Sequence, residues 1–425
     1  MALASRVGAR VRDTLRHGYG RVGPRLLFLA LIAVMRLAET QTSKHWLETQ
    51  TYSVAQWVLG LFSHADGVVV IDIADLPPEK GVTPRQALLD LMSRLQVAGA
   101  SAIGVDIDFS PENNLFVAPD DPRFFSDCLS FQTRFKIPVY LGVARTAGNR
   151  PEAWLGRREF APLAAGIVIP DASGTVSDGG APGPYPLFIP RLDDTLRLEA
   201  ESSGTKLLSM AMALASVVKA DIEHELTTPG RISEPAVERA VIKGVSVPEF
   251  PVNYGFIRQL QQASIPSKEV GPGKLPVGPR GEGPIVLIGD LKGSSRSDVF
   301  TTRGSAASAS GVLIHASATL TLMRTPLSVL NEWARGGLEL ALLLGIGAAM
   351  GKPRKRLTPK QWQWIRRGLA AAVAITVLGL FYAGILWLDW LAVLLVAVIH
   401  SFLKRTEEPA VEDAAHSGRE VVTTS

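Results

Sequence analysis

The sequence contains a single cysteine, Cys128, so no disulfide can form within the chain. A chain of 425 residues can do without one, because it is long enough to bury a substantial apolar core. The helix predicted after Asp121 favours a small buried side chain at Cys128 over a reactive thiol. The chain also lacks a phosphate-binding motif: the loop 289–298, which follows an apolar run, has neither the GxGxxG nor the GxxxxGK[ST] spacing, so the sequence gives little support for a phosphate site. We predict no cofactor and no metal.

Positive charge is scarce in the middle of the chain and concentrated at its ends. Residues 39–332 carry 26 lysines and arginines against 32 acids, whereas the rest of the chain carries 18 against 8. The net charge of +4 and the pI of about 9.2 therefore come from the flanking segments. A nucleic-acid partner is not predicted, because binding nucleic acid would require basic residues clustered on a folded domain.

The flanks also hold the apolar segments, which we interpret as membrane helices at residues 26–38, 333–350, 368–388 and 390–403. Residues 368–388 are 21 in number and carry no formal charge, enough for ~30 Å of hydrocarbon at ~1.5 Å per residue. Residues 390–403 are short for a span. Residues 26–38 could also be the apolar core of a signal peptide. No small-residue cleavage site follows them, so we favour an uncleaved anchor.

Basic residues set the expected orientation of these helices. The loop 351–367 has seven basic residues and no acid, which is typical of a cytoplasmic loop. The basic segment 1–25 and the tail 404–425 favour the same side. These markers agree if four helices cross the bilayer and residues 39–332 lie outside. The predicted location is a bacterial cell inner membrane, with the main domain in the periplasm.

The exported region alternates between predicted strands and helices. Apolar runs rich in β-branched residues, such as 67–74, are typical of strands buried on both faces of a parallel sheet. Helix signals follow between them, for instance Thr83 and Pro84 before a helix that Gly99 ends. The same patterns predict helices over 205–219 and 307–324, a buried strand over 284–291, a long surface loop over 173–190 and a Pro/Gly linker over 264–283. We therefore predict an α/β fold, a three-layer sandwich with a mostly parallel sheet, outside the cytoplasm. An α-helical membrane region of one N-terminal and three C-terminal helices would accompany it.

Three aspartates follow two of the predicted strands. Asp72, Asp106 and Asp108 lie towards the carboxyl ends of strands that we expect to be neighbours, where open α/β folds place their ligands. Carboxylates converging there could hold a divalent cation and assist hydrolysis. They could equally cap the following loops by accepting backbone N–H bonds, and we favour capping or ligand contact over catalysis.

Three further polar residues are candidates for the same cleft. His315 opens an apolar helix, and a partly buried, hydrogen-bonded histidine is its simplest interpretation. It could also line a pocket together with Asp298 in the loop 289–298. Asn253, at the end of another strand, would add a neutral hydrogen-bonding group.

Six segments, taken in order, resemble a known family: GVVVIDIA (67–74), AGA (98–100), AIGVDIDFS (102–110), PVNYG (251–255), VLIGDLKGSSRSDVFTT (286–302) and GVLIHASATLTLM (311–323). Together they resemble the CHASE family, type two, which are sensory extracellular domains associated with cyclases and histidine kinases. The resemblance covers about residues 45–326 and implies a non-enzymatic sensory domain held between membrane helices. Family members normally feed a cytoplasmic output enzyme. Here only residues 404–425 follow the last helix, polar and disordered in composition, which is typical of a stand-alone member.

The sequence therefore predicts a membrane-anchored sensor. It would bind an unknown small-molecule or protein ligand outside and signal through its helices to a separate cytoplasmic or membrane partner. A homodimer is expected from how such sensors transmit. Two alternatives remain: a metal-assisted ectohydrolase using Asp72, Asp106 and Asp108, with His315 as a further candidate, and a structural subunit of an envelope complex.

Overall fold

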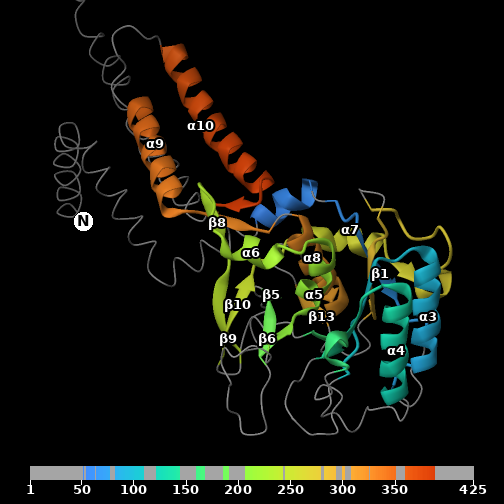
Figure 1. The fold of residues 1–425 in the computed structure, drawn as a ribbon. Coiled ribbons are helices and arrows are strands. Elements are labelled where there is room, and N and C mark those ends of the chain that lie inside the picture. Colours follow the sequence, from blue (N-terminus) through green and yellow to red (C-terminus); the bar gives the residue numbers. More distant parts are fainter. Residues whose placement is uncertain are drawn as a thin grey trace, which may run out of the picture. The chain divides into compact units, whose positions relative to one another are not determined.

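The computed structural model describes residues 51, 54–62, 64–76, 82–109, 121–143, 159–167, 185–190, 206–242, 245–278, 282–292, 299–301, 308–324, 326–350 and 359–387. The chain divides into two compact units. One is an α/β body formed by residues 52–331 together with 381–386. The other comprises residues 1–51, 332–380 and 387–425 and contains most of the two long helices α9 (Glu332–Met350) and α10 (Pro359–Tyr382) (Figure 1).

A six-stranded parallel sheet forms the centre of the body. Its strand order is β11 (Ile265–Pro266), β1 (Val68–Asp72), β12 (Ile285–Gly289), β2 (Ala102–Val105), β3 (Val139–Val143) and β4 (Ala164–Gly166). Every pairing between neighbours in this order is parallel. The strands β2 and β12 are buried along their whole length, as expected of apolar strands covered on both faces. The predicted α/β class with a mostly parallel sheet is confirmed.

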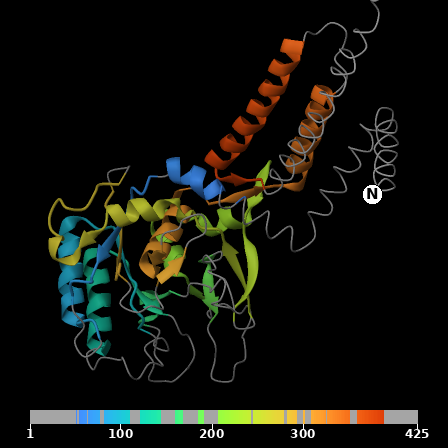
Figure 2. The same cartoon turned by 180° about the vertical axis from the view of Figure 1, so that it is seen from behind.

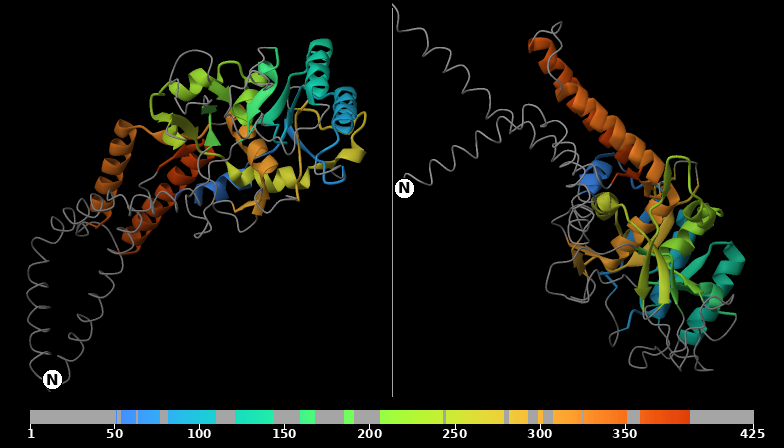
Figure 3. Two further views of the ribbon diagram at one scale, coloured as in Figure 1. Left: turned by 90° about the horizontal axis from the view of Figure 1, so that it is seen from below. Right: turned by 90° about the vertical axis from the view of Figure 1, so that its left-hand side faces the viewer.

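Helices cover both faces of this sheet. Helices α3 (Arg85–Ala98) and α4 (Asp121–Phe135) pack on one face, and α5 (Met210–Val218) and α8 (Gly311–Arg324) pack on the other (Figures 1 and 2). Side chains of β1 alternate accordingly, because Val69 and Ile71 join the core beneath α3 and α4 while Val68 and Val70 join the core beneath α5 and α8. Figure 3 shows the same layers from two further directions.

Short strands and helices complete the body. Strands β5 (Tyr185–Pro186), β10 (Val245–Phe250) and β9 (Glu238–Ile242) form one antiparallel sheet. The pairs β6 (Phe188–Pro190) with β7 (Lys206–Leu208), and β13 (Val299–Thr301) with β14 (Ser308–Ser310), are also antiparallel. The short helices are η2 (Ala161–Leu163), α6 (Ile222–Thr227), η4 (Tyr254–Phe256), α7 (Ile257–Gln262) and η5 (Ser267–Glu269).

Several element boundaries differ from the sequence prediction. The helix predicted from residue 205 begins at Met210, because Ser209 caps it by accepting a hydrogen bond from the Met212 N–H at 3.3 Å. The helix predicted from residue 307 begins at Gly311, since β14 precedes it directly. The predicted linker 264–283 contributes the edge strand β11 and η5, and the predicted loop 173–190 contains β5 and β6.

A further three-stranded sheet contains the strands that flank the two long helices in the chain. Its order is β16 (Ile385–Leu386), β15 (Ser328–Leu330) and β8 (Ser233–Pro235). Strand β15 comes just before α9 (Glu332–Met350), and β16 comes just after α10 (Pro359–Tyr382). The two strands pair in parallel, with Ser328 opposite Ile385 and Val329 opposite Leu386.

The bounds predicted for the helix at 368–388 are wrong at both ends. Helix α10 begins at Pro359, inside the predicted loop 351–367. Helix α10 stops at Tyr382, and Gly384 then adopts a left-handed φ of 72°, which turns the chain into β16. Among the helices of the described ranges, none combines the length and the apolar character needed to cross a membrane. The predicted spans 26–38 and 390–403 lie outside the described residues.

Candidate functional site

The carboxyl edge of the central sheet brings two of the predicted aspartates onto one face. Asp72 ends β1 and Asp106 follows β2, and both continue the alternation that faces α5 and α8. The two strands are not neighbours as predicted, because β12 lies between them. At ~4.8 Å between adjacent strands, the backbones carrying the two aspartates are therefore about 10 Å apart.

Helix α8 packs closely against the strand that lies between these aspartates. Gly289, at the end of β12, lies between them in the sheet. A Cβ atom on Gly289 would lie 2.7 Å from the Val312 Cβ and 3.3 Å from the Asp106 Cβ. Glycine is thus required here because the first turn of α8 approaches the strand closely.

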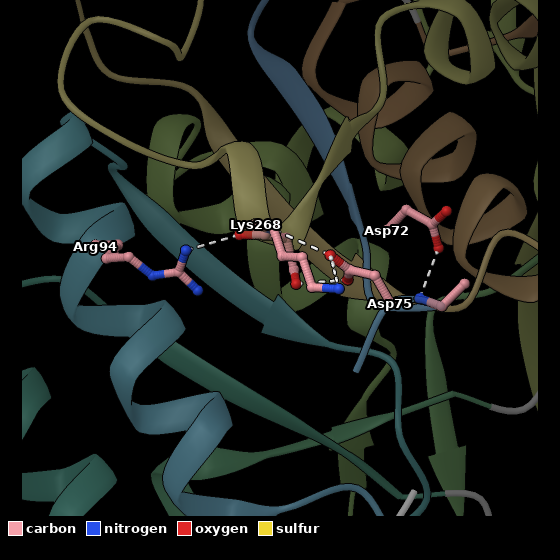
Figure 4. Close-up of polar contacts among 6 residues, drawn as sticks. Asp72, Asp75, Arg94 and Lys268 are labelled. Carbon is pink, nitrogen blue, oxygen red and sulfur yellow. Dashed lines mark hydrogen bonds and ion pairs between the residues drawn. The ribbon is translucent and has the colours of Figure 1, made fainter. Parts of the chain in front are cut away.

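Asp72 serves as a cap between two loops. Its Oδ1 accepts hydrogen bonds from the backbone N–H of Ala74 at 3.0 Å, drawn in Figure 4, and from that of Leu291 at 3.2 Å. This is the loop-capping role that the sequence left open as an alternative. Asp72 thereby joins the loop after β1 to the loop after β12.

Asp75, which the sequence did not suggest, anchors the edge strand. Figure 4 shows its carboxylate facing the segment after β11. Asp75 Oδ1 accepts from the Ser267 hydroxyl at 2.6 Å, and Oδ2 accepts from the Lys268 N–H at 3.2 Å. Arg94 on α3 donates to the Ser267 carbonyl at 2.9 Å. No local sequence signal predicts this contact, because its partners are more than 170 residues apart.

His315, on α8, joins Asp106 to Tyr185 in a buried polar network. The Tyr185 hydroxyl lies 2.5 Å from His315 Nδ1, and Nε2 lies 3.5 Å from Asp106 Oδ1. The side chains of His315 and Asp106 are 1% and 8% exposed, and Tyr185 is 1% exposed. We call Asp106, His315 and Tyr185 the His315 network. It connects the central sheet, α8 and the small sheet that contains β5.

The imidazole of His315 is neutral in the folded protein. Burial lowers its pKa from 6.5 to about 3, because the charged ring would lose its hydration. Burial also raises the pKa of Tyr185 well above its ordinary value. The simplest assignment has the Tyr185 hydroxyl donating to Nδ1, so that the Nε2–H of the neutral ring faces Asp106 Oδ1 at 3.5 Å. A polar network this deeply buried holds the elements that carry its residues together.

The remaining predicted residues lie apart from this network. Asn253 caps η4 by accepting from the Gly255 N–H at 3.0 Å, and its own N–H donates to Thr321 Oγ1 at 3.0 Å. Thr321 is about 9 Å further along the axis of α8 than His315, so Asn253 does not join the predicted cleft. Asp108 is half-buried after β2. Asp298 lies outside the described residues. In the described part of the chain, no three histidine, cysteine or acidic side chains are grouped so as to hold a metal ion.

A second buried charge cluster lies on the opposite face of the sheet and was not predicted. Arg85, at the start of α3, donates from Nε to Asp121 Oδ1 at 2.5 Å, and both side chains are 6% exposed. The guanidinium also lies over the rings of Phe109 and Phe124, at 4.4 and 5.7 Å from their centroids. The pair ties the beginnings of α3 and α4 together beneath an aromatic cluster. The sequence did not predict this burial, because an arginine at the start of an amphipathic helix, such as Arg85, is usually exposed.

A parallel α/β body with a buried network beside its C-terminal helix is compatible with a binding or sensory domain. The family model described as "CHASE2 domain" matches residues 27–351, and the chain belongs to this family of sensory extracellular domains. The predicted resemblance is confirmed, and the match extends beyond the predicted range 45–326 at both ends. No curated protein and no solved structure matches the chain.

Proposed function

We propose that this chain is a membrane-anchored extracytoplasmic sensor that passes a signal through its helices to a separate partner. The family supports the sensory role. The apolar segments 26–38, 333–350, 368–382 and 390–403, with the basic loop 351–367, support the membrane anchoring. The ligand is a small molecule or a protein outside the cytoplasm, and the body itself carries out no catalysis.

The pairing of β15 with β16 supports the proposed topology. These strands flank α9 and α10 in the sequence and belong to the same compact body. The start of α9 and the end of α10 therefore lead from the same side of the membrane. The basic stretch 351–367, which covers the connection between the two helices and the first turns of α10, then belongs on the other side. This is the arrangement that the distribution of lysine and arginine favours.

The observation that carries the signalling proposal is the position of the His315 network on α8. Asp106 and Tyr185 contact the first half of this helix through His315. Helix α8 ends at Arg324, β15 begins at Ser328, and α9 begins at Glu332. A ligand at the carboxyl edge, near Asp106 and Asp72, would shift α8 and through it the strand pair β15–β16. Both membrane helices then respond together.

The output partner lies in the membrane or the cytoplasm, where the basic loop 351–367 offers a recruitment surface. A homodimer would let the helix movement act across a two-fold axis. In the described residues the aspartates do not converge into a metal centre, which leaves the hydrolase alternative without a supporting observation.

Hydrogen exchange tests whether the network is coupled to the membrane helices. The variant Tyr185→Phe removes one hydroxyl and leaves Nδ1 of His315 unsatisfied, which costs about 1–3 kcal/mol. If α8 is the coupling element, the backbone amides of α8, β15 and β16 should exchange faster in the full-length protein, by about tenfold. The matched control Tyr140→Phe removes a hydroxyl from β3, outside the network. An increase confined to residues near position 185, or equal in the control, would show that α8 does not transmit.

A further inference from the structure

Helical residues 54–62 bury one face in the body and expose an apolar face on the other side. Ala55 and Val58 are fully or almost fully buried. By contrast, Trp57, Leu61 and Phe62 are 64%, 59% and 55% exposed. Trp57 and Leu61 are one turn apart and share a face of the helix. Exposed large side chains of this kind cost free energy in water and mark an interaction surface when they are grouped.

Fixed contacts hold this helix in its orientation. The Gln56 side-chain amide donates to the Val252 carbonyl at 2.6 Å. Gly60 packs directly on Gly255, because a Cβ atom added to Gly255 would lie 2.6 Å from the Gly60 Cα. These contacts form only if the helix face that carries Gln56 and Gly60 points into the body. The apolar face therefore cannot turn into the core, and it is presented outward by the fold.

Tyr382 extends the exposed face to the end of α10. Its ring centroid lies 5.4 Å from that of Phe62, with the planes at 87°, an edge-to-face contact. Tyr382 is itself 67% exposed, and it is the last residue of α10. Both rings belong to the same compact body. We call Trp57, Leu61, Phe62 and Tyr382 the aromatic rim.

We propose that the aromatic rim lies in the outer headgroup region of the lipid bilayer. The inference rests on the proposed function, in which the apolar part of α10 crosses the membrane and ends at the outer surface. Tyr382 then marks the boundary, and the ring contact brings Phe62 to the same depth. Tryptophan and tyrosine are the side chains enriched at this boundary, because their rings are apolar and their N–H and O–H groups remain hydrated. The body is thereby held against the membrane surface as well as tethered to it.

The size of the rim favours lipid over a second protein. Four side chains exposed to this extent present on the order of 500 Å², compared with ~800 Å² per partner in a stable interface between proteins. A lipid surface has no such minimum, because each inserted aromatic side chain contributes independently. A second copy of this chain, or another segment of it, would instead shield the rim from lipid.

Spin labels on the full-length protein in vesicles of phosphatidylethanolamine and phosphatidylglycerol test this proposal. In a Cys128→Ala background, labels are placed through Leu61→Cys on the rim, Ile375→Cys on α10 and Arg123→Cys on α4. Ile375 is 69% exposed and the Arg123 side chain is 87% exposed. At each position, the accessibility of the spin label to oxygen, which concentrates in lipid, is compared with its accessibility to a water-soluble nickel chelate. Trp57→Cys gives a second rim position if Leu61→Cys does not fold.

The expected result is high oxygen and low nickel accessibility at positions 61 and 375, with nickel accessibility several-fold higher at position 123. If position 375 is in lipid but position 61 behaves like position 123, the rim proposal fails and the membrane proposal stands. If positions 61 and 375 both behave like position 123, the membrane proposal fails as well. Low accessibility to both reagents at position 61 means a protein contact and also overturns the rim proposal.

Discussion

Replacing His315 with glutamine should change how the stability of the protein depends on pH. The histidine is neutral in the folded state, since burial lowers its pKa to about 3. In the unfolded chain its pKa returns to about 6.5. Between these two pH values the unfolded chain binds a proton that the folded protein does not. The contribution of His315 is thus fully present above pH 6.5 and is lost as the pH falls towards 3.

The size of the effect follows from the difference in pKa. Below pH 6.5 the folded protein loses about 1.4 kcal/mol of stability for each pH unit. The loss from this one residue is therefore about 1.4 kcal/mol at pH 5.5 and about 3 kcal/mol at pH 4.5. Glutamine cannot titrate, so its packing cost is the same at every pH. Ionisable groups that lie away from His315 occur in both proteins and cancel in the difference.

Urea unfolding of the full-length protein in a mild detergent, at pH 7.0, 5.5 and 4.5, measures this difference. We expect the stability of the wild type relative to His315→Gln to decrease by about 3 kcal/mol from pH 7.0 to 4.5. As a surface control, His224→Gln replaces an exposed histidine on α6 and should change stability at pH 7 by less than ~0.5 kcal/mol. A relative stability that rises as the pH falls would mean that His315 forms an ion pair with Asp106, and the neutral network would be refuted.

Two further predictions concern the packing around the sheet. Gly289→Ala should lower the free energy of unfolding by about 1–3 kcal/mol, because its Cβ would lie 2.7 Å from the Val312 Cβ. Gly271→Ala, with open space around it, should be nearly neutral. Urea unfolding compares the two variants, and equal values would mean that α8 is not closely packed on β12. Arg85→Met should cost about 3–5 kcal/mol, because it removes the cation that faces the buried Asp121 carboxylate. The double variant with Asp121→Leu should recover much of this loss, and additive losses in the double-mutant cycle would show that the pair is not coupled.

Local patterns in the sequence were sufficient to predict the strands and helices of the central sheet. The β-branched run at 67–74 became β1, and Gly99 ended α3 in a left-handed conformation, as expected of a C-terminal glycine. The apolar run at 284–291 became β12. These features depend on residues close together in the chain, which is why the sequence alone reveals them.

The long-range contacts of the site could not be predicted in the same way. Strand β12 inserts between β1 and β2 although almost 180 residues separate it from β2, and no local pattern records that order. Tyr185 lies in a Gly/Pro-rich segment that reads as a surface loop, yet it is buried against His315. Asp106 and His315 were both candidates for one cleft in the sequence, and the structure places their side chains 3.5 Å apart.

The early end of α10 has a similar cause. Residues 383–388 are apolar and uncharged, so they read as a continuation of the helix. Gly384 allows the turn, and pairing with β15 satisfies the backbone of Ile385 and Leu386. Tertiary pairing thus outweighs the local preference for helix at these residues.

Sidedness is the central claim, and labelling of single cysteines on intact cells tests it most directly. The native Cys128 should not react with the maleimide, because it is fully buried and burial raises the pKa of its thiol far above the ordinary value. A membrane-impermeant maleimide should label Val277→Cys, on an exposed part of the body, from outside the inner membrane. It should label Lys360→Cys only after the membrane is permeabilised. Labelling of position 360 from outside, or of position 277 only after permeabilisation, would contradict the proposal of an extracytoplasmic sensor.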